Sequence, residues 1–206
     1  RPAVAGQFYP GDRARLERAL ERMFMDERFG PGGLPIGGPS AQLTVAGVAP
    51  HAGYMYSGPA AAHLYKRIAE SHPRIDTAVI IGTNHSGIGS TYVTTSRYTS
   101  WATPLGEVRV DLDFIEELRK LYPALEDNEV PHEYEHSVEV QLPFLQFIYG
   151  DRIQLVPIVA KWPRVEEARR LAEAIAEAAR ALGRLTIVIA SSDFTHHGYI
   201  YDYVVF

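Results

Sequence analysis

The sequence contains no cysteine, which excludes disulfide bonds and thiolate metal ligands within its 206 residues. No apolar run approaches the roughly 18 residues that a membrane-spanning helix needs, and the first residues lack the apolar core of a signal peptide. The net charge is −5, so the composition gives no sign of the basic surface typical of nucleic-acid-binding proteins. Together, these absences favour a cytoplasmic protein that binds neither nucleic acid nor membranes.

The composition is otherwise that of an ordinary globular protein, with 46% hydrophobic and 22% charged residues. The length suits one domain with a substantial core, and no repeat or linker divides it, so we expect residues 1–206 to form a single domain. Residues 199–206 are apolar and strand-like to the last residue. An exposed apolar strand invites aggregation, so we expect a further C-terminal segment to follow.

Three apolar runs predict strands, and a loop containing a histidine follows each of them. Residues 43–49 precede His51, residues 77–82 precede His85, and residues 185–190 precede His196. The first run is rich in β-branched residues and is bounded by proline, which favours an interior strand. If the three strands lie parallel, their carboxyl ends share one edge of the sheet, where α/β proteins place their ligand sites. We therefore expect the three imidazoles to converge.

The remaining pattern alternates strands with helices. Further strands are expected at residues 153–159, 90–95 and 107–110, the last two on either side of a loop containing Trp101. Helices are expected after the capping residues Asp12, Ser57, Asp111 and Ser137, with a kink at Pro143, and over residues 164–182. This alternation predicts an α/β fold with a central mixed, largely parallel sheet flanked by helices.

Histidines at strand ends can bind metal, transfer protons or serve a purely structural role. For one histidine alone the structural role is the more frequent, but three in equivalent positions favour a site. Two histidines and one carboxylate form the usual ligand set of non-haem Fe(II) oxygenases. His51 and His85, with Asp193, Glu139 or a residue after the last one of this chain, would satisfy it, and zinc is also chemically acceptable. Asp193 and His196 are three residues apart and could serve the same centre or orient one another.

Other polar and aromatic residues near these loops are candidates for the pocket or for supporting the ligands. Tyr54 follows His51 and can line a pocket, although such tyrosines more often pack in the core. Asn84 precedes His85 in the same loop. His136 directly precedes the helix predicted from Ser137, where the partial positive charge of a helix N-terminus would act on it.

Two other kinds of chemistry have weaker support. Ser191 and Ser192 lack the glycine pattern of a nucleophile elbow. The glycines around His51 form neither a dinucleotide nor a P-loop fingerprint, so no nucleotide cofactor is expected.

Five segments of the chain closely resemble the Memo family. They occur in family order along the whole sequence, at residues 6–10 (GQFYP), 50–58 (PHAGYMYSG), 82–85 (GTNH), 135–143 (EHSVEVQLP) and 191–196 (SSDFTH). The resemblance implies a fold like that of class III extradiol ring-cleaving dioxygenases, with a central sheet flanked by helices.

The resemblance also implies roles for individual residues. His51 and His85 match the positions at which those dioxygenases bind iron, His196 matches their catalytic acid/base histidine, and Asp193 lines the pocket. The third ligand position in Memo proteins is a cysteine in a later segment, which is absent from these residues. The cofactors implied are iron or copper, with zinc ranked behind them. The partners implied are a small-molecule or peptide ligand and, among prokaryotic members, a radical-SAM protein and an AMMECR-type protein.

Two hypotheses of function follow. The first is a metal-dependent oxidoreductase of unknown substrate, in which His51 and His85 hold the metal while His196 moves protons and Asp193 tunes it. The second is a non-catalytic module in which the same pocket binds a peptide or a small anion without metal. We rank the enzyme first because convergent imidazoles are costly to maintain without a chemical role.

Overall fold

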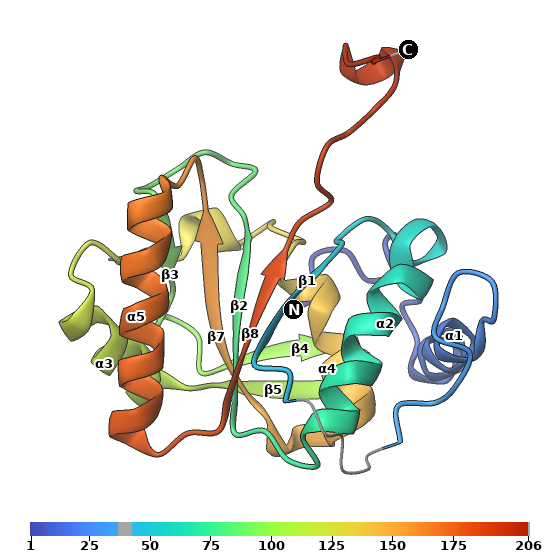
Figure 1. Cartoon of the computed structure of the whole chain (residues 1–206), viewed down its shortest axis with the longest axis horizontal. Coiled ribbons are helices and arrows are strands. Elements are labelled where there is room, and N and C mark those ends of the chain that lie inside the picture. Colours follow the sequence, from blue (N-terminus) through green and yellow to red (C-terminus); the bar gives the residue numbers. More distant parts are fainter. Residues whose placement is uncertain (37–42, 206) are drawn as a thin grey trace.

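The computed structural model describes residues 1–36 and 43–205, which form an α/β fold around one mixed sheet. Figure 1 shows the sheet between two groups of helices. The strands are β1 (Ala46–Ala49), β2 (Thr77–Thr83), β3 (Tyr92–Thr94), β4 (Ser100–Thr103), β5 (Gly106–Val110), β6 (Glu126–Asp127), β7 (Gln154–Ala160) and β8 (Thr186–Ser191). The α-helices are α1 (Arg13–Met25), α2 (Tyr54–Ser71), α3 (Leu112–Leu121), α4 (Leu142–Tyr149) and α5 (Val165–Leu182).

The sheet has the order β1-β8-β2-β7-β3-β6, and the β4–β5 hairpin joins it through β5 and β7. Strands β1, β8, β2 and β7 run parallel, whereas β3 is antiparallel to β7. The predicted mixed, largely parallel sheet is thus confirmed. Strands β1, β8 and β2 are also direct neighbours, so the loops that follow them begin at one edge of the sheet.

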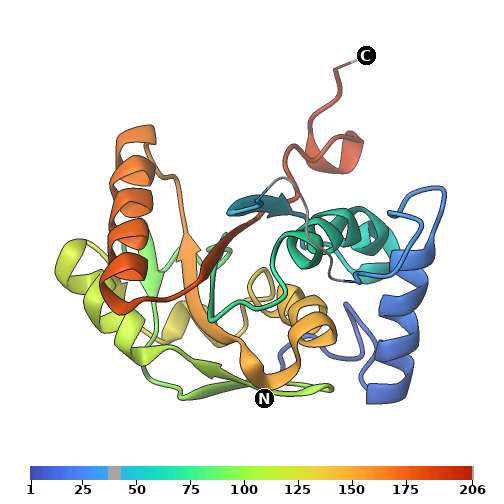
Figure 2. The same cartoon turned by 60° about the horizontal axis from the view of Figure 1, so that its bottom comes forward.

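Both faces of the sheet are covered by helices. In Figure 1, α3 and α5 cover one face while α1, α2 and α4 cover the other, and Figure 2 shows the same two layers from below. Because side chains alternate along a strand, neighbouring residues of β2 enter different cores. Val79 packs with Phe114 and Leu171 on one side, and Ile80 belongs to the cluster around Phe144 on the other.

The helix limits follow the predicted caps at three places. The side chain of Asp12 accepts a hydrogen bond from the Arg15 N–H at the start of α1, and Asp111 accepts one from the Phe114 N–H at the start of α3. Helix α5 ends at Gly183, whose left-handed backbone glycine adopts readily. The predicted helix after Ser57 begins instead at Tyr54, and Gly53 is its N-cap residue. The Ser57 hydroxyl donates to the Ala52 carbonyl from within α2, so its predicted capping role is wrong.

Other predicted elements also differ from the structure. Strand β1 is a four-residue edge strand with only Ala49 buried, because it pairs with β8 on one side; the predicted interior strand is wrong. The loop predicted around Trp101 contains strand β4, which pairs with β5. The segment after Ser137 forms a short 3₁₀ turn (Glu139–Gln141) before α4. Pro143 therefore lies in the first turn of α4, where its missing N–H breaks no hydrogen bond and the predicted kink does not arise.

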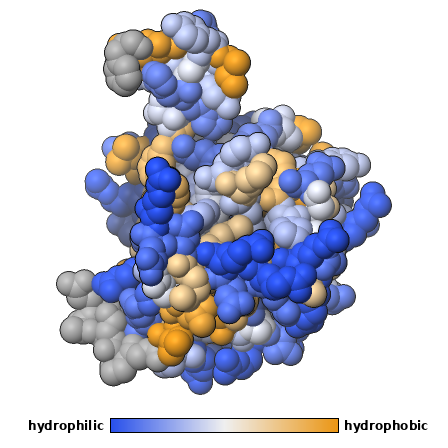
Figure 3. Space-filling view, turned by 90° about the vertical axis from the view of Figure 1, so that its right-hand side faces the viewer, coloured by the Kyte–Doolittle hydropathy of each residue, from blue (hydrophilic) through white to orange (hydrophobic). Residues whose placement is uncertain are grey.

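The C-terminal residues also depart from the prediction of a strand. Residues Tyr199–Tyr201 form a 3₁₀ turn, closed by a bridge between Gly198 and Tyr203, and Phe206 lies outside the described residues. Figure 3 shows this segment standing away from the rest of the surface, with hydrophobic side chains on it. Ile200 and Val205 are among its exposed residues. Within residues 1–36 and 43–205, no helix is long and apolar enough to cross a membrane.

Candidate metal centre

Three histidines converge beyond the carboxyl ends of β1 and β2. His51 follows β1, His85 follows β2, and His136 comes from the loop before α4. Each ring offers one nitrogen, and these three nitrogens lie within 4.8 Å of one another. The rings of His85 and His136 are stacked with centroids 4.7 Å apart, and the ring of His51 stands edge-on to both at 5.4 Å.

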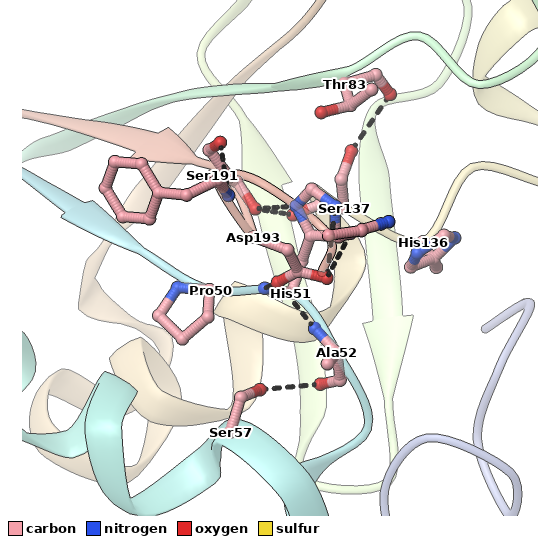
Figure 4. A network of polar contacts seen from close by, with 12 residues as sticks. Pro50, His51, Ala52, Ser57, Thr83, His136, Ser137, Ser191 and Asp193 are labelled. Atoms are coloured by element: carbon pink, nitrogen blue, oxygen red, sulfur yellow. Dashed lines mark hydrogen bonds and ion pairs between the residues drawn. The ribbon is translucent and has the colours of Figure 1, made fainter. Parts of the chain in front are cut away.

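Buried hydrogen bonds determine which nitrogen of His51 is free. The Ser191 hydroxyl donates its one hydrogen to the Ser137 carbonyl at 2.6 Å and accepts from the Gln141 amide at 2.8 Å. The Nδ1 of His51 lies 3.1 Å from the same hydroxyl oxygen, so Nδ1 carries the proton and donates to Ser191. The lone pair of His51 Nε2 is then available to a metal ion. Figure 4 shows His51 between Ser191 and Asp193 in this network.

His85 is oriented by a buried carboxylate. Glu135 is 4% exposed, and its oxygens lie 3.0 Å from His85 Nδ1. The carboxylate also accepts hydrogen bonds from the backbone N–H groups of His85, at 3.0 Å, and Ser137, at 2.8 Å. Because an ionised carboxylate only accepts, His85 Nδ1 carries the proton and Nε2 is left free. A carboxylate behind a histidine is the usual support of a metal-ligating imidazole.

The charges of the site favour neutral imidazoles beside an ionised acid. Burial lowers the pKa of His51, and this effect outweighs the opposing attraction of Asp193. Burial likewise lowers the pKa of His136, against the attraction of Glu135. Burial alone would raise the pKa of Glu135, but hydrogen bonds from Ser137 and His85 outweigh it and lower that pKa. Neutral imidazole is the form that binds a metal ion, so the donor set fits one.

Asp193 and His196 lie beside the cluster without joining it. Asp193 Oδ1 accepts hydrogen bonds from the backbone N–H groups of His51 and Ala52 at 2.6 and 3.0 Å. The other oxygen, Oδ2, lies 3.7 Å from His51 Nε2 and 3.9 Å from His196 Nε2. The His196 side chain is half exposed and also contacts the Tyr201 ring. The structure thus brings His51 and His85 together. Asp193 lies between His51 and His196, so His196 is separated from the cluster by this carboxylate.

The other predicted pocket residues have different surroundings. Asn84 is buried and holds the turn that carries His85, since its side chain binds the Ile88 carbonyl and the Gly87 N–H. Tyr54 packs in the core, where its hydroxyl donates to the Val140 carbonyl at 2.6 Å. Glu139 accepts hydrogen bonds from the N-terminal segment and lies outside the group of three histidines.

Sequence reasoning missed two features of this site. It gave His136 a supporting place rather than a place among the three converging imidazoles, and it gave Glu135 no role. The available signal was the pair of adjacent residues itself: an acid beside a histidine, in a segment with no helical or strand periodicity. Their contact with His85, 50 residues earlier, depends on the tertiary fold.

We predict that replacing Gly82 by alanine destabilises the protein. A Cβ atom at Gly82 would lie 2.2 Å from the Ser137 hydroxyl and 3.0 Å from Val138, both fully buried beneath the histidines. Overpacking of this kind lowers the free energy of unfolding by about 1–3 kcal/mol. Urea denaturation measures this change, and Gly33→Ala is a matched control because, among the described residues, only the flexible end of Lys66 lies near that position. Equal stabilities of the two variants would contradict the close packing of Ser137 against β2.

Comparison with known proteins gives one consistent family. The family model described as Memo-like protein matches residues 1–205. A MEMO1 family protein of Methanopyrus kandleri is 46% identical over 95% of this chain and 68% of its own length. A MEMO1 family protein of Ignicoccus hospitalis is 45% identical over 95% of this chain and 68% of its own, and one of Thermococcus kodakarensis is 44% identical over all of this chain and 68% of its own.

Proposed function

Because the chain belongs to the Memo-like protein family, we propose that His51, His85 and His136 hold one iron or copper ion in a metal-dependent oxidoreductase. The observation that carries this proposal is the convergence of three imidazole nitrogens within 4.8 Å. The hydrogen bonds behind His51 and His85 add to it, because each leaves Nε2 free.

Iron or copper would supply redox chemistry, which zinc lacks, and this ranks zinc behind them. Three nitrogen ligands would leave coordination positions open to a substrate. The half-exposed His85 side chain marks the solvent side of the cluster, whereas His51 is 3% exposed and marks its floor. The substrate, a small molecule or a peptide, would approach from the side of His85.

In this enzyme, Asp193 and His196 would act as a proton-transfer pair. His196 Nε2 is 3.9 Å from Asp193 Oδ2, and the same oxygen is 3.7 Å from His51 Nε2. In this pair, the exposed His196 would exchange protons with the substrate next to the Asp193 carboxylate. In this role, Asp193 also fixes the backbone of the loop that carries His51, through its two hydrogen bonds to N–H groups.

The proposal is tested by metal analysis of the protein purified without oxygen. We expect close to one iron or copper ion per chain and consumption of oxygen by the loaded protein. No bound metal, together with binding of a peptide or small anion that survives chelation, would reject the enzyme and support the non-catalytic module.

The affinity for the metal should depend on pH in a defined direction. Protons compete with metal for imidazole, but the pKa values of His51 and His136 are lowered by burial, so both rings are still neutral near the ordinary histidine value of 6.5. Protonation of His51 and His136 should therefore not weaken metal binding between pH 8 and about pH 6.5, and it should do so only at more acidic pH. Nitrogen NMR of the metal-free protein that finds either ring protonated well above pH 7 would contradict the lowered pKa values.

A further inference from the structure

A cavity of about 600 Å³ lies next to the β4 strand, and none of the three converging histidines lines it. This volume lies within the range of small-molecule sites in proteins. Its aromatic lining comes from Tyr98, Trp101 and Tyr134, and its ionisable lining includes His132, Glu133 and Glu139.

Glu139 brings an unneutralised negative charge to the cavity. It is 4% exposed, and within residues 1–36 and 43–205 its carboxylate forms no ion pair with a lysine, arginine or histidine. Oε1 accepts from the Val4 N–H and the Tyr9 hydroxyl, whereas Oε2 accepts only from the Ala3 N–H. A carboxylate has about four acceptor positions, so one on Oε2 remains unfilled. The three hydrogen bonds stabilise the carboxylate, and a cation at the open position of Oε2 would add to them.

His132 lines the cavity with a buried ring. The residue is 5% exposed, and its Nε2 lies 3.1 Å from the Val93 carbonyl, which can only accept. The proton is therefore on Nε2; Nδ1 has no partner among the described residues and is closed to solvent, so a ligand in the cavity does not reach it. Burial lowers the pKa of His132 to about 4, so the ring is neutral.

The aromatic side chains that line the cavity can also attract a cation. The faces of tyrosine and tryptophan rings attract cations within about 6 Å of the ring centre. Trp101 stands edge-on to His132 with centroids 6.0 Å apart, and its buried indole N–H also has no partner among the described residues. That N–H is closed to solvent, so the ring and not the N–H is what Trp101 offers to a ligand in the cavity.

From this combination we propose that the cavity binds a small organic cation, an ammonium or guanidinium group held by Glu139 and by the rings of Trp101 and Tyr134. None of the three converging histidines lines the cavity. Arg1 also lines the cavity and is exposed. A bound cation would have no need of Arg1, whereas an anionic ligand would use it, so Arg1 distinguishes the two.

Tryptophan fluorescence tests the proposal directly. The chain has two tryptophans, and Trp162 is 93% exposed. In a Trp162→Phe background, Trp101 is the only reporter. Titration with n-butylammonium chloride should change its fluorescence saturably, with a dissociation constant on the order of millimolar for so small a probe. Neutral n-butanol and anionic butyrate, at the same ionic strength, should give no saturation.

Variants identify the residues that bind the probe. Glu139→Gln should weaken butylammonium binding at least about tenfold, although this change also touches the N-terminal segment. Tyr134→Ala removes an exposed ring with no such structural role and should weaken binding at least about threefold. The equally exposed Tyr56→Ala, on α2, should have no effect, and Arg1→Ala should bind equally or more tightly.

Three outcomes would overturn the proposal. Equal saturation by all three probes would show a merely apolar cavity. Preference for butyrate, lost in Arg1→Ala, would assign the cavity to an anion. Binding of butylammonium unchanged in both Glu139→Gln and Tyr134→Ala would place the cation elsewhere.

Discussion

Replacing His51 by alanine should weaken metal binding by at least about 100-fold. Structural zinc sites with four protein ligands bind with roughly 10–16 kcal/mol, so one ligand is worth about 3 kcal/mol. His51 should show the full effect because its ring is buried and held by Ser191, and no other imidazole can move into its place without breaking that packing. Titration with Fe(II) under anaerobic conditions, or with a Cu(I) indicator, measures the change in affinity.

The control for this variant is His63→Ala. His63 is an exposed histidine on α2 that contacts the Phe29 carbonyl, and it is not one of the three converging histidines. It should leave the affinity unchanged, and circular dichroism should show both variants folded. A folded His51→Ala protein that binds metal like the parent would show that the converging histidines are not the ligands.

Replacing Glu135 by glutamine should weaken metal binding by about 10–100-fold, the usual loss when the group that supports a ligating histidine is changed. The carboxylate accepts from His85 Nδ1 and from two backbone N–H groups, and the amide of glutamine would direct its own N–H toward one of these donors. The His85 ring would lose both its negative partner and its fixed tautomer. Isothermal titration gives the affinity, and nitrogen NMR of the metal-free protein gives the tautomer.

Glu133→Gln is the matched control, since it removes an exposed acid two residues away in the same loop. It should change neither the affinity nor the NMR spectrum of His85. If Glu135→Gln kept the parent tautomer and affinity, the carboxylate would be a structural anchor of the loop without influence on the metal.

The sequence was sufficient to predict the strands that position the site. Long apolar runs identify β2, β7 and β8 within one residue or so at each end, because a run flanked by polar loops has few other stable conformations. The histidines that directly follow β1 and β2 are carried to the same edge by the parallel pairing of these strands with β8. Their approach is therefore a consequence of local pattern and sheet topology.

The rest of the site depends on contacts between distant segments. His196 follows the end of β8 by five residues of irregular chain, so the strand does not fix where its ring lies. His136 lies in a segment whose position is set by Glu135 and Ser137, through bonds to residues of the β2 strand and its loop. Nor does any local pattern distinguish β1 as an edge strand, since its position depends on what pairs with it. The N-cap residue of α2 is Gly53, which has no side chain to form a capping hydrogen bond. The sequence pattern therefore favours Ser57, whose hydroxyl could form one.

The most direct measurement is an anomalous-scattering crystal structure of the iron- or copper-loaded protein. We predict one peak, bonded at about 2.0–2.2 Å to imidazole nitrogens of His51, His85 and His136, with the Nδ1 atoms of His51 and His85 still turned to Ser191 and Glu135. A peak elsewhere, or an ion that leaves His136 unbound, would contradict the three-histidine centre.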